Sequence, residues 1–299
     1  MIPFHKVLIT GANGFLGHHL CRQLLEKGVT VIATGTGPSR LPFEHDKYFI
    51  YEAMDCTDAA RVKEVLLLHR PDAIIHAAAI SKPDECELDK EKAFMNNVNG
   101  TMHLLQAASV YHPYFLYVST DFVFDGEKGM YTEEDIPNPV NYYGQTKWDA
   151  EKSVQAYKGR FSIARTVLVY GKPLSGKDNI LTIVQKKLLA GEKYRVVSDQ
   201  FRTPTYVEDL ATGIILMLEN KAAGIYHLSG EEIMTPYDMA LAVAKHLQLD
   251  ASLLEEVNAS VFSQPAKRPP KTGFRIDKAK RELGFSPIPF SEGLKKTIA

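Results

Sequence analysis

Tyr143 and Lys147 are the two residues whose types and spacing are best suited to chemistry. On a helix, residues four apart share one face, which makes the tyrosine phenol and the lysine ammonium neighbours. A phenol with a pKa of about 10 is a poor proton donor at neutral pH, but a nearby ammonium stabilises the phenolate and lowers that pKa. The pair therefore predicts that Tyr143 protonates a developing alkoxide, although the same spacing also occurs on ordinary solvated helices.

A glycine-rich segment near the start of the chain is the second chemical feature. An apolar run at 6–10, typical of a buried strand, is followed by Gly11-Ala-Asn-Gly14-Phe-Leu-Gly17 and then by a helical pattern of leucines. Glycines let the backbone approach a pyrophosphate closely, and the free N–H groups at a helix start attract its charge. This order predicts a dinucleotide site. The loop residues expected to contact the dinucleotide are Gly11, Asn13, Gly14, Phe15, Leu16 and Gly17.

Buried strands that alternate with amphipathic helices are expected to position these residues. The alternation predicts an α/β fold, a Rossmann-type doubly wound parallel sheet with helices on both faces. Thr235, which precedes Pro236, is expected to cap one of the helices. The expected strands are 29–34, 48–53, 73–77, 114–119, 161–169, 194–197 and 225–228, and the expected helices are 59–68, 93–109, 207–218 and 236–247.

The pattern of expected strands and helices changes near residue 171, after which the strands are shorter and alternate less regularly with helices. Residues 1–170 are expected to form a dinucleotide-binding Rossmann domain that also carries the catalytic residues. Residues 171–299 are expected to form mainly a smaller C-terminal substrate-binding lobe, with the option that the chain crosses back to the Rossmann sheet. A substrate cleft is expected between the two parts.

The composition narrows the classes of partner. The chain has 299 residues, 45% of them hydrophobic, and its 35 Lys and Arg nearly balance its 36 Asp and Glu, which gives no support to a nucleic-acid surface. No apolar run approaches the roughly 18 to 20 residues that span a bilayer, and the first residues lack the zones of a signal peptide. We therefore expect a cytoplasmic protein with a small-molecule partner and no membrane contact.

Cysteine and histidine give no indication of a metal site. Cys21, Cys56 and Cys86 are too widely spaced for a disulfide framework or a zinc site, and we expect reduced thiols. His18 and His19 adjoin within the first helix, but none of the ten histidines forms a close ligand set with carboxylates. No catalytic metal is expected.

Three motifs taken together resemble the extended short-chain dehydrogenase/reductase family: Gly11 to Gly17, Ser119-Thr-Asp-Phe-Val-Phe-Asp-Gly126, and Tyr143 to Lys147. Within that family the chain is similar to the dTDP-4-dehydrorhamnose reductase branch, in the second motif and also in Tyr131-Thr-Glu-Glu-Asp135 and Asp199-Gln-Phe-Arg-Thr-Pro-Thr205. The resemblance spans nearly the whole chain. It implies an NAD(P)H-dependent oxidoreductase that reduces the 4-keto group of a nucleotide-activated deoxysugar.

The resemblance assigns catalytic roles to Thr120, Tyr143 and Lys147. Thr120 would hold the carbonyl oxygen, Tyr143 would donate the proton, and Lys147 would lower the pKa of Tyr143 and bond the nicotinamide ribose. Asn97 would brace the sheet edge, with a helix-capping role left open. The cofactor contacts implied beyond the glycine loop are Asp55, Cys56, Ala77, Ala78, Ala79, Asn97, Ser119, Tyr143 and Lys147.

The end of the second strand bears on the choice of cofactor. The run Thr34-Gly-Thr-Gly-Pro-Ser-Arg40 offers no carboxylate to a ribose 2′-hydroxyl, whereas Arg40 can pair with a 2′-phosphate. The sequence therefore favours NADP(H). NAD(H) stays open, because Thr34, Thr36 and Ser39 also suit a neutral ribose.

On the substrate side, arginine suits a diphosphate because its planar fork donates paired hydrogen bonds, but a structural ion pair remains the alternative for each arginine. The chain departs from the reductase branch at Pro83-Asp84, where that branch usually has Val-Asp, and this departure puts the identity of the sugar in question. The implied substrate contacts are Lys82, Thr120, Asp121, Phe122, Arg202 and Arg268.

Two alternatives to the reductase remain open. One is a sugar-nucleotide epimerase or dehydratase of the same family, which recycles a retained cofactor. The other is a non-catalytic regulatory protein, because Pro83-Asp84, Tyr131 to Lys152 and Tyr226-His-Leu-Ser-Gly230 resemble the beta subunit of methionine adenosyltransferase. A homodimer is also left open.

Overall fold

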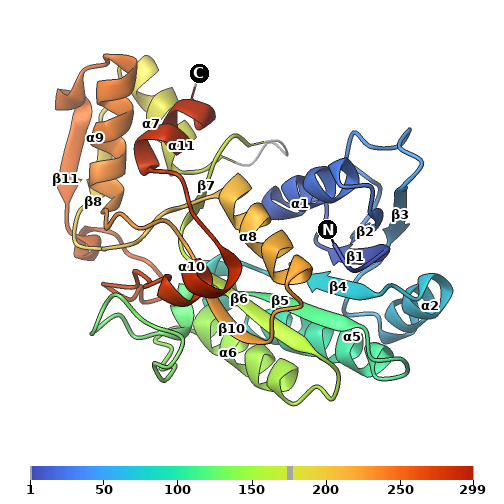
Figure 1. Cartoon of the computed structure of the whole chain (residues 1–299). Helices are drawn as coiled ribbons and strands as arrows, with labels where there is room; N and C mark the ends of the chain where they lie inside the picture. Colours follow the sequence, from blue (N-terminus) through green and yellow to red (C-terminus); the bar gives the residue numbers. More distant parts are fainter. Residues whose placement is uncertain (1, 174–177, 299) are drawn as a thin grey trace.

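The computed structural model describes residues 2–173 and 178–298. Its centre is a seven-stranded sheet with the order β10-β6-β5-β4-β1-β2-β3, in which every neighbouring pair is parallel. Helices cover both of its faces (Figure 1). The predicted α/β Rossmann-type fold is confirmed. The strands are β1 Lys6–Thr10, β2 Thr30–Gly35, β3 Phe49–Ala53, β4 Ala73–His76, β5 Tyr114–Thr120, β6 Phe161–Thr166 and β10 Gly224–Leu228.

Alternate side chains of the strands supply two apolar layers, because successive strand residues point to opposite faces. Val7 and Ile9 of β1 pack in the cluster that includes α1 (Phe15–Glu26) and α8 (Val207–Glu219). Leu8, between them, packs in the cluster on the other face. That second cluster includes residues of α2 (Ala59–His69), α5 (Gly100–Ala108) and α6 (Tyr142–Gln155).

Two predicted elements are interrupted where they approach the carboxyl edge of the sheet. The strand expected at 161–169 ends at Thr166, and after Leu168, whose φ is +30°, a short β7 (Val169–Tyr170) pairs with β9 (Thr205–Tyr206). The helix expected at 93–109 is also wrong as one regular element. It consists of α4 (Lys90–Phe94), a π-helical turn at Met95–Asn99, and α5. Apolar periodicity does not reveal the extra residue of a π-turn.

The C-terminal part builds a second core and then returns to the sheet. Its helices α7 (Ile180–Leu189), α9 (Pro236–Leu247) and α11 (Phe290–Thr297) share one apolar cluster with the paired strands β8 (Tyr194–Val197) and β11 (Leu254–Val257). Thr235 caps α9 in a capping box with Asp238, which confirms the predicted helix start. In Figure 1 this lobe stands beside the sheet. Strand β10 belongs to the seven-stranded sheet itself, and the helices α8 and α10 (Asp277–Leu283) pack next to it.

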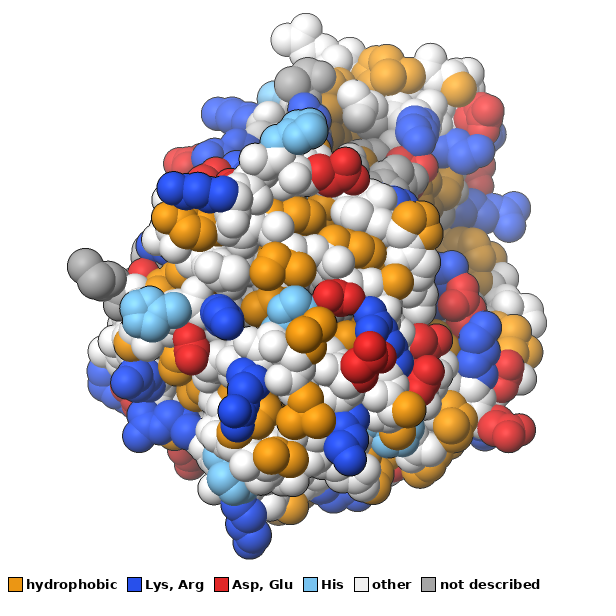
Figure 2. Space-filling view, turned by 90° about the vertical axis from the view of Figure 1, so that its right-hand side faces the viewer, with side chains coloured by type: hydrophobic (Ala, Val, Ile, Leu, Met, Phe, Trp, Pro, Cys, Tyr) orange, Lys and Arg blue, Asp and Glu red, His pale blue; other side chains and the backbone are white. Residues whose placement is uncertain are grey.

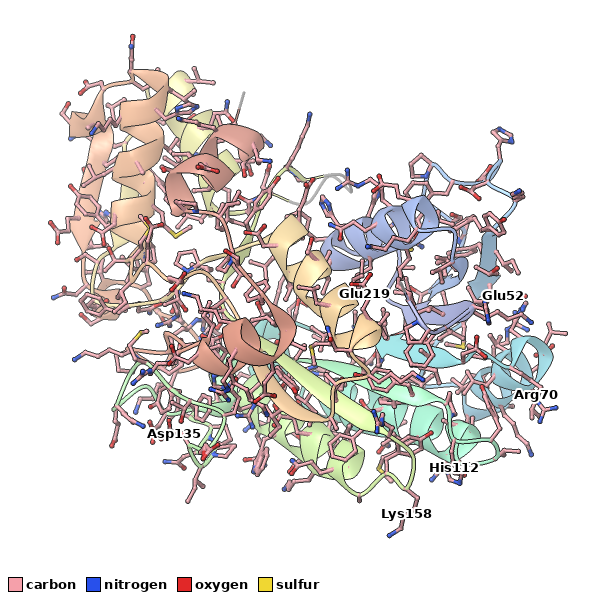
Figure 3. The ribbon with its side chains drawn as sticks, in the orientation of Figure 1. Glu52, Arg70, His112, Asp135, Lys158 and Glu219 are labelled. Carbon is pink, nitrogen blue, oxygen red and sulfur yellow. The ribbon has the colours of Figure 1, made fainter. Side chains whose placement is uncertain are left out.

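The exposed edge of the sheet is occupied by charged residues. Glu52 of β3, labelled in Figure 3, accepts one hydrogen bond from Arg61 (2.6 Å) and pairs with His69 (2.8 Å) of α2. Charged side chains on an edge strand disfavour pairing with another chain. Acidic and basic side chains are scattered together over the face shown in Figure 2.

The described ranges 2–173 and 178–298 contain no helix that is both long and apolar enough to span a bilayer. In the same residues, no three or more His, Cys, Asp or Glu side chains are grouped as metal ligands would be. Cys21, Cys56 and Cys86 are free thiols.

Candidate active site

A cleft of about 840 Å³ opens at the carboxyl ends of the strands, which is where open α/β sheets bind ligands. It runs from the glycine loop between β1 and α1, past the ends of β4 and β5, to Pro236 of the C-terminal lobe. The predicted site residues that line it are Gly11, Asn13, Gly14, Phe15, Leu16, Gly17, Arg40, Asp55, Cys56, Ala77, Ala78, Ala79, Ser119, Thr120, Asp121, Phe122, Tyr143, Lys147, Arg202 and Arg268.

The glycine loop forms a tight cradle at one end of the cleft. Gly11 has a φ of +69°, and a Cβ added there would lie 2.9 Å from the backbone of Ala78. A Cβ at Gly17 would lie 2.6 Å from the Cα of Ala12, so neither position accepts a side chain without moving backbone. The N-cap of α1 is Gly14, which provides no side-chain cap. The first N–H groups of α1 are therefore available to an anionic group such as a phosphate.

Asn13 braces the neighbouring loop, which carries Arg40. The Asn13 amide donates to Pro38 O (3.1 Å) and to the Tyr51 hydroxyl (2.8 Å), and its Oδ1 accepts from Arg40 N (2.9 Å). The Tyr51 hydroxyl in turn donates to Gly37 O (2.9 Å). The side chain of Arg40 lies exposed at the rim of the cleft. Tyr51 was not expected at the site, because its link to Asn13 joins distant parts of the chain.

Asn97 lies behind the cleft wall. Its buried side chain accepts from Ile80 N (2.8 Å) and donates to Ile80 O (3.1 Å) and to the Thr146 hydroxyl (3.0 Å). Thr146 donates to Tyr143 O (2.8 Å). Asn97 itself does not line the cleft, and its side chain has the bracing geometry that was one of its two expected roles, with no helix-cap hydrogen bond to the described residues. The expected dinucleotide contact stays a prediction. The π-turn positions this brace between the end of β4 and α6.

Tyr143 and Lys147 lie buried at the start of α6, where Asn141 caps the helix by accepting from Gly144 N (2.8 Å). Burial raises the pKa of Tyr143, and a hydrogen bond with the Thr120 side chain opposes that rise. The prediction that the ammonium lowers the pKa of the phenol is therefore wrong in this structure. Lys147 Nζ instead donates to Val118 O (2.8 Å) and lies 4.1 Å from the centre of the Tyr117 ring.

Burial also lowers the pKa of Lys147 to about 7, while the charge of Glu151 opposes this shift. Glu151, one turn further along α6, forms a fully buried, two-bond ion pair with Arg165 of β6, with distances of 3.0 and 2.6 Å. This pair fastens the helix that carries the two functional side chains to the sheet beneath it.

A buried polar network surrounds Asp121, the residue that follows Thr120 in the wall of the cleft. Thr272 donates to this carboxylate, and Arg202 Nε lies 3.8 Å from it. Burial raises the pKa of Asp121, while the Arg202 charge opposes this. Arg202 also donates to the backbone carbonyls of Pro269 (2.7 Å) and Pro270 (3.1 Å). Of the two roles left open for Arg202, the structure shows the internal ion pair.

Arg268 and Lys82 also form ion pairs within the protein. Arg268 makes two hydrogen bonds to the carboxylate of Asp84, at 2.5 and 2.6 Å, and its side chain still reaches the cleft. Lys82, the N-cap of α3 (Pro83–Leu88), pairs with Glu85 at 2.5 Å on the surface. Its side chain does not line the cleft, so the expected substrate contact of Lys82 stays a prediction.

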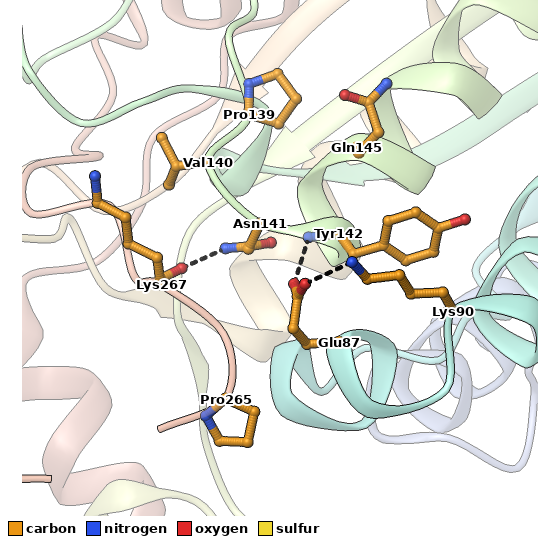
Figure 4. A pocket seen from close by; sticks show the side chains of 9 residues that line it. All are labelled: Glu87, Lys90, Pro139, Val140, Asn141, Tyr142, Gln145, Pro265 and Lys267. Carbon is orange, nitrogen blue, oxygen red and sulfur yellow. Dashed lines mark hydrogen bonds and ion pairs between the residues drawn. The ribbon is translucent and has the colours of Figure 1, made fainter. Parts of the chain in front are cut away.

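A smaller pocket of about 370 Å³ adjoins the start of α6 (Figure 4). Within it, Glu87 accepts from Tyr142 N (2.9 Å), and the Asn141 amide donates to Lys267 O (2.8 Å). These bonds tie the first turn of α6 both to α3 and to the segment that leads to Arg268. Asn141 was missed as a supporting residue, although an asparagine directly before a predicted helix is a typical N-cap.

The arrangement defines a class of protein. A threonine hydroxyl, a buried phenol and a buried ammonium at the edge of a parallel sheet, beside a glycine cradle for a dinucleotide, form the site of a short-chain dehydrogenase/reductase. Residues 5–299 match the family model described as RmlD substrate binding domain. The chain therefore belongs to that family.

Individual relatives agree with this assignment. The chain is 32% identical to methionine adenosyltransferase 2 subunit beta of Xenopus laevis, over 99% of this chain and 88% of the relative. It is 30% identical to dTDP-4-dehydrorhamnose reductase of Aggregatibacter actinomycetemcomitans, over 98% of each chain. The structure of dTDP-4-dehydrorhamnose reductase from Bacillus anthracis in complex with NADP superposes with a TM-score of 0.85, at 29% identity and 97% coverage of each chain.

Proposed function

We propose that this protein is an NAD(P)H-dependent oxidoreductase that reduces the 4-keto group of a nucleotide-activated deoxysugar, as dTDP-4-dehydrorhamnose reductase does. The observation that carries the proposal is that Thr120, Tyr143 and Lys147 line the same cleft as the glycine cradle and Arg268. We assign the cofactor to the cradle. We assign most of the substrate-binding part of the cleft to the C-terminal lobe, within residues 171–299.

The chain's own groups account for the proton transfer. Because burial raises the pKa of Tyr143, the phenol carries its proton at neutral pH, but the same shift makes it a weaker acid than a free phenol. The Thr120 hydroxyl, hydrogen-bonded with Tyr143, orients the carbonyl oxygen that receives this proton. The bound nicotinamide supplies the hydride. The side chains of Thr120, Tyr143 and Lys147 are themselves buried.

The residues of the cleft fit a dinucleotide. The glycine cradle leaves the helix N–H groups accessible, and the hydroxyl of Ser119 is buried at the cleft with no hydrogen-bond partner among the described residues. A buried, unpaired hydroxyl is costly unless a ligand bonds it. Arg40 adds a positive charge at the rim, which suits a 2′-phosphate. NADP(H) is therefore the favoured cofactor, and NAD(H) remains an alternative.

Replacing Arg40 with alanine is expected to weaken NADPH binding about tenfold and to leave NADH binding nearly unchanged. The reason is that a charge-assisted hydrogen bond to an exposed 2′-phosphate contributes on the order of 1.5 kcal/mol. Fluorescence titration with each cofactor measures the two dissociation constants. Lys47→Ala, which removes an exposed cation outside the cleft, is the matched control. Equal losses for both cofactors in Arg40→Ala would show that Arg40 only shapes the loop.

The lowered pKa of Lys147 predicts that cofactor binding depends on pH. Below a pH of about 7 the free protein carries the Lys147 ammonium, and above it the amine becomes neutral and can no longer attract the dinucleotide. NADPH affinity is therefore expected to fall steadily between pH 7 and 9. In Lys147→Met, affinity should be weaker and almost flat over this range. An equally steep fall in that variant would assign the titration to another group.

The direct test is the oxidation of NADPH in the presence of dTDP-4-dehydrorhamnose. Oxidation equal to the product formed would establish the reductase. Conversion of a nucleotide sugar without net oxidation would favour the epimerase alternative. The 32% identity to a methionine adenosyltransferase beta subunit supports a second candidate, a regulatory protein. A stable complex with a methionine adenosyltransferase catalytic subunit, without any turnover of the keto-sugar, would favour it.

The cellular setting remains part of the proposal. We expect a cytoplasmic protein that binds no nucleic acid, and we keep a homodimer as an open alternative. Sedimentation velocity would measure the oligomeric state, and a monomer at micromolar concentration would contradict the homodimer.

A further inference from the structure

The ion pair between Asp84 and Arg268 joins two segments that are 184 positions apart in the sequence. Asp84 lies in the first turn of α3, at the point where the chain departs from the reductase pattern. Its carboxylate accepts two hydrogen bonds from Arg268 (2.5 and 2.6 Å) and one from Ala266 N (3.1 Å). It therefore holds both the arginine and the backbone that leads to it.

Three of the N–H groups of the Arg268 guanidinium are used for hydrogen bonds within the protein. Nη1 donates to Asp84 and to Ala266 O (2.6 Å), and Nη2 uses one hydrogen for Asp84. A guanidinium has five N–H groups, so the Nε–H and one Nη2–H, which share one edge, stay available to a ligand. Arg268 lines the cleft, whereas Asp84 does not. The carboxylate thus binds the guanidinium at its end and leaves its other edge without a hydrogen-bond partner among the described residues.

The other cations near this end of the cleft are less suited to an anion. Arg202 donates to three backbone carbonyls and lies beside Asp121, and Lys82 lies outside the cleft, paired with Glu85. The hydrogen bonds from Arg268 are the main reason why the pKa of Asp84 is lowered. The Asp84 carboxylate is therefore charged at neutral pH. An arginine held in place loses less entropy when it binds a ligand than a freely rotating one.

We infer that Asp84 is a positioning residue, which presents the free edge of Arg268 to an anionic group of the substrate, of the diphosphate class. This inference rests on the proposed function, since a nucleotide-activated sugar supplies such a group. Asp84 acts through Arg268 and does not touch the substrate.

The test is a double-mutant cycle on the binding of dTDP, measured by titration calorimetry with NADP present. Asp84→Ala is expected to weaken dTDP binding about three- to tenfold, because the guanidinium has to be ordered on binding. Arg268→Ala is expected to weaken it at least as much, and the double variant should be no weaker than Arg268→Ala alone. In turnover, Asp84→Ala should raise KM and leave kcat nearly unchanged.

Two controls separate positioning from general damage. NADP affinity should be unchanged in each variant, and Glu91→Ala, which removes an exposed carboxylate of α4, should leave dTDP binding unchanged. Asp84→Asn, which keeps one acceptor oxygen, should lose less affinity than Asp84→Ala.

Unchanged or tighter dTDP binding in Asp84→Ala would overturn the inference, and so would additive losses in the double variant. The dTDP affinities of the four proteins could follow the expected cycle while the unaltered protein reduces no keto-sugar. That result would overturn the proposed function and uphold the role of Asp84. Failure of the unaltered protein to bind dTDP would overturn both.

Discussion

Tyr143→Phe is expected to lower kcat by about 10²- to 10⁴-fold and to leave NADP(H) affinity close to that of the unaltered protein. The substitution removes only the phenolic hydroxyl, which is the proposed proton donor, and keeps the ring that packs against Phe122. Because the hydroxyl acts on the developing alkoxide, its loss should affect the transition state far more than the bound ground state.

The measurement is steady-state oxidation of NADPH with the keto-sugar, together with a cofactor titration of the same sample. Tyr142→Phe is the matched control, because it removes a hydroxyl from the adjacent residue, which lines the smaller pocket of Figure 4 instead of the cleft. Turnover in Tyr143→Phe within a few-fold of that in Tyr142→Phe would refute the assigned proton donor.

Glu151→Ala is expected to lower the free energy of unfolding by about 3–5 kcal/mol, the cost of leaving one buried charge without its partner. The Arg165 side chain is almost fully buried, and its charge would remain beneath α6 without the carboxylate that bonds it, with the ring of Phe124 and the more distant charge of Glu133 nearby. The loss should also disturb the site, because α6 carries Tyr143 and Lys147.

Urea denaturation measures this loss, with Asp149→Ala as the control. Asp149 pairs with Lys152 on the exposed side of the same helix, so its removal should cost no more than about 1 kcal/mol. Replacing Glu151 and Arg165 together with methionine should recover most of the stability, because no unpaired charge then remains. An equal loss in Glu151→Ala and Asp149→Ala would show that the ion pair does not fasten α6.

Local patterns in the sequence predicted the fold and the centre of the site. The spacing of Tyr143 and Lys147 needs only a helix to bring the two side chains to one face, and the glycine loop needs only the strand before it and the helix after it. Both depend on residues close in sequence, where backbone periodicity determines the geometry. The sheet topology followed for the same reason, since alternating strands and helices permit few arrangements.

The supporting contacts were not predictable, because they join distant segments. Two of them are the hydrogen bond from Asn13 to Tyr51 and the ion pair between Asp84 and Arg268. Both depend on tertiary packing that no local pattern encodes. The pKa of Tyr143 was misjudged for a related reason. Spacing showed that Lys147 is near, but burial of the phenol determines the direction of the shift.

The strand order also governs how the protein can assemble during synthesis. Every strand of the sheet except β10 lies before residue 171, but β6 pairs with β10, which begins only at Gly224. Until that segment leaves the ribosome, one side of β6 presents unpaired N–H and C=O groups, and α1 lacks its packing partner α8. Residues 1–170 therefore cannot complete the sheet or its apolar cluster before the later part of the chain is made, and exposed strand edges of this kind favour aggregation.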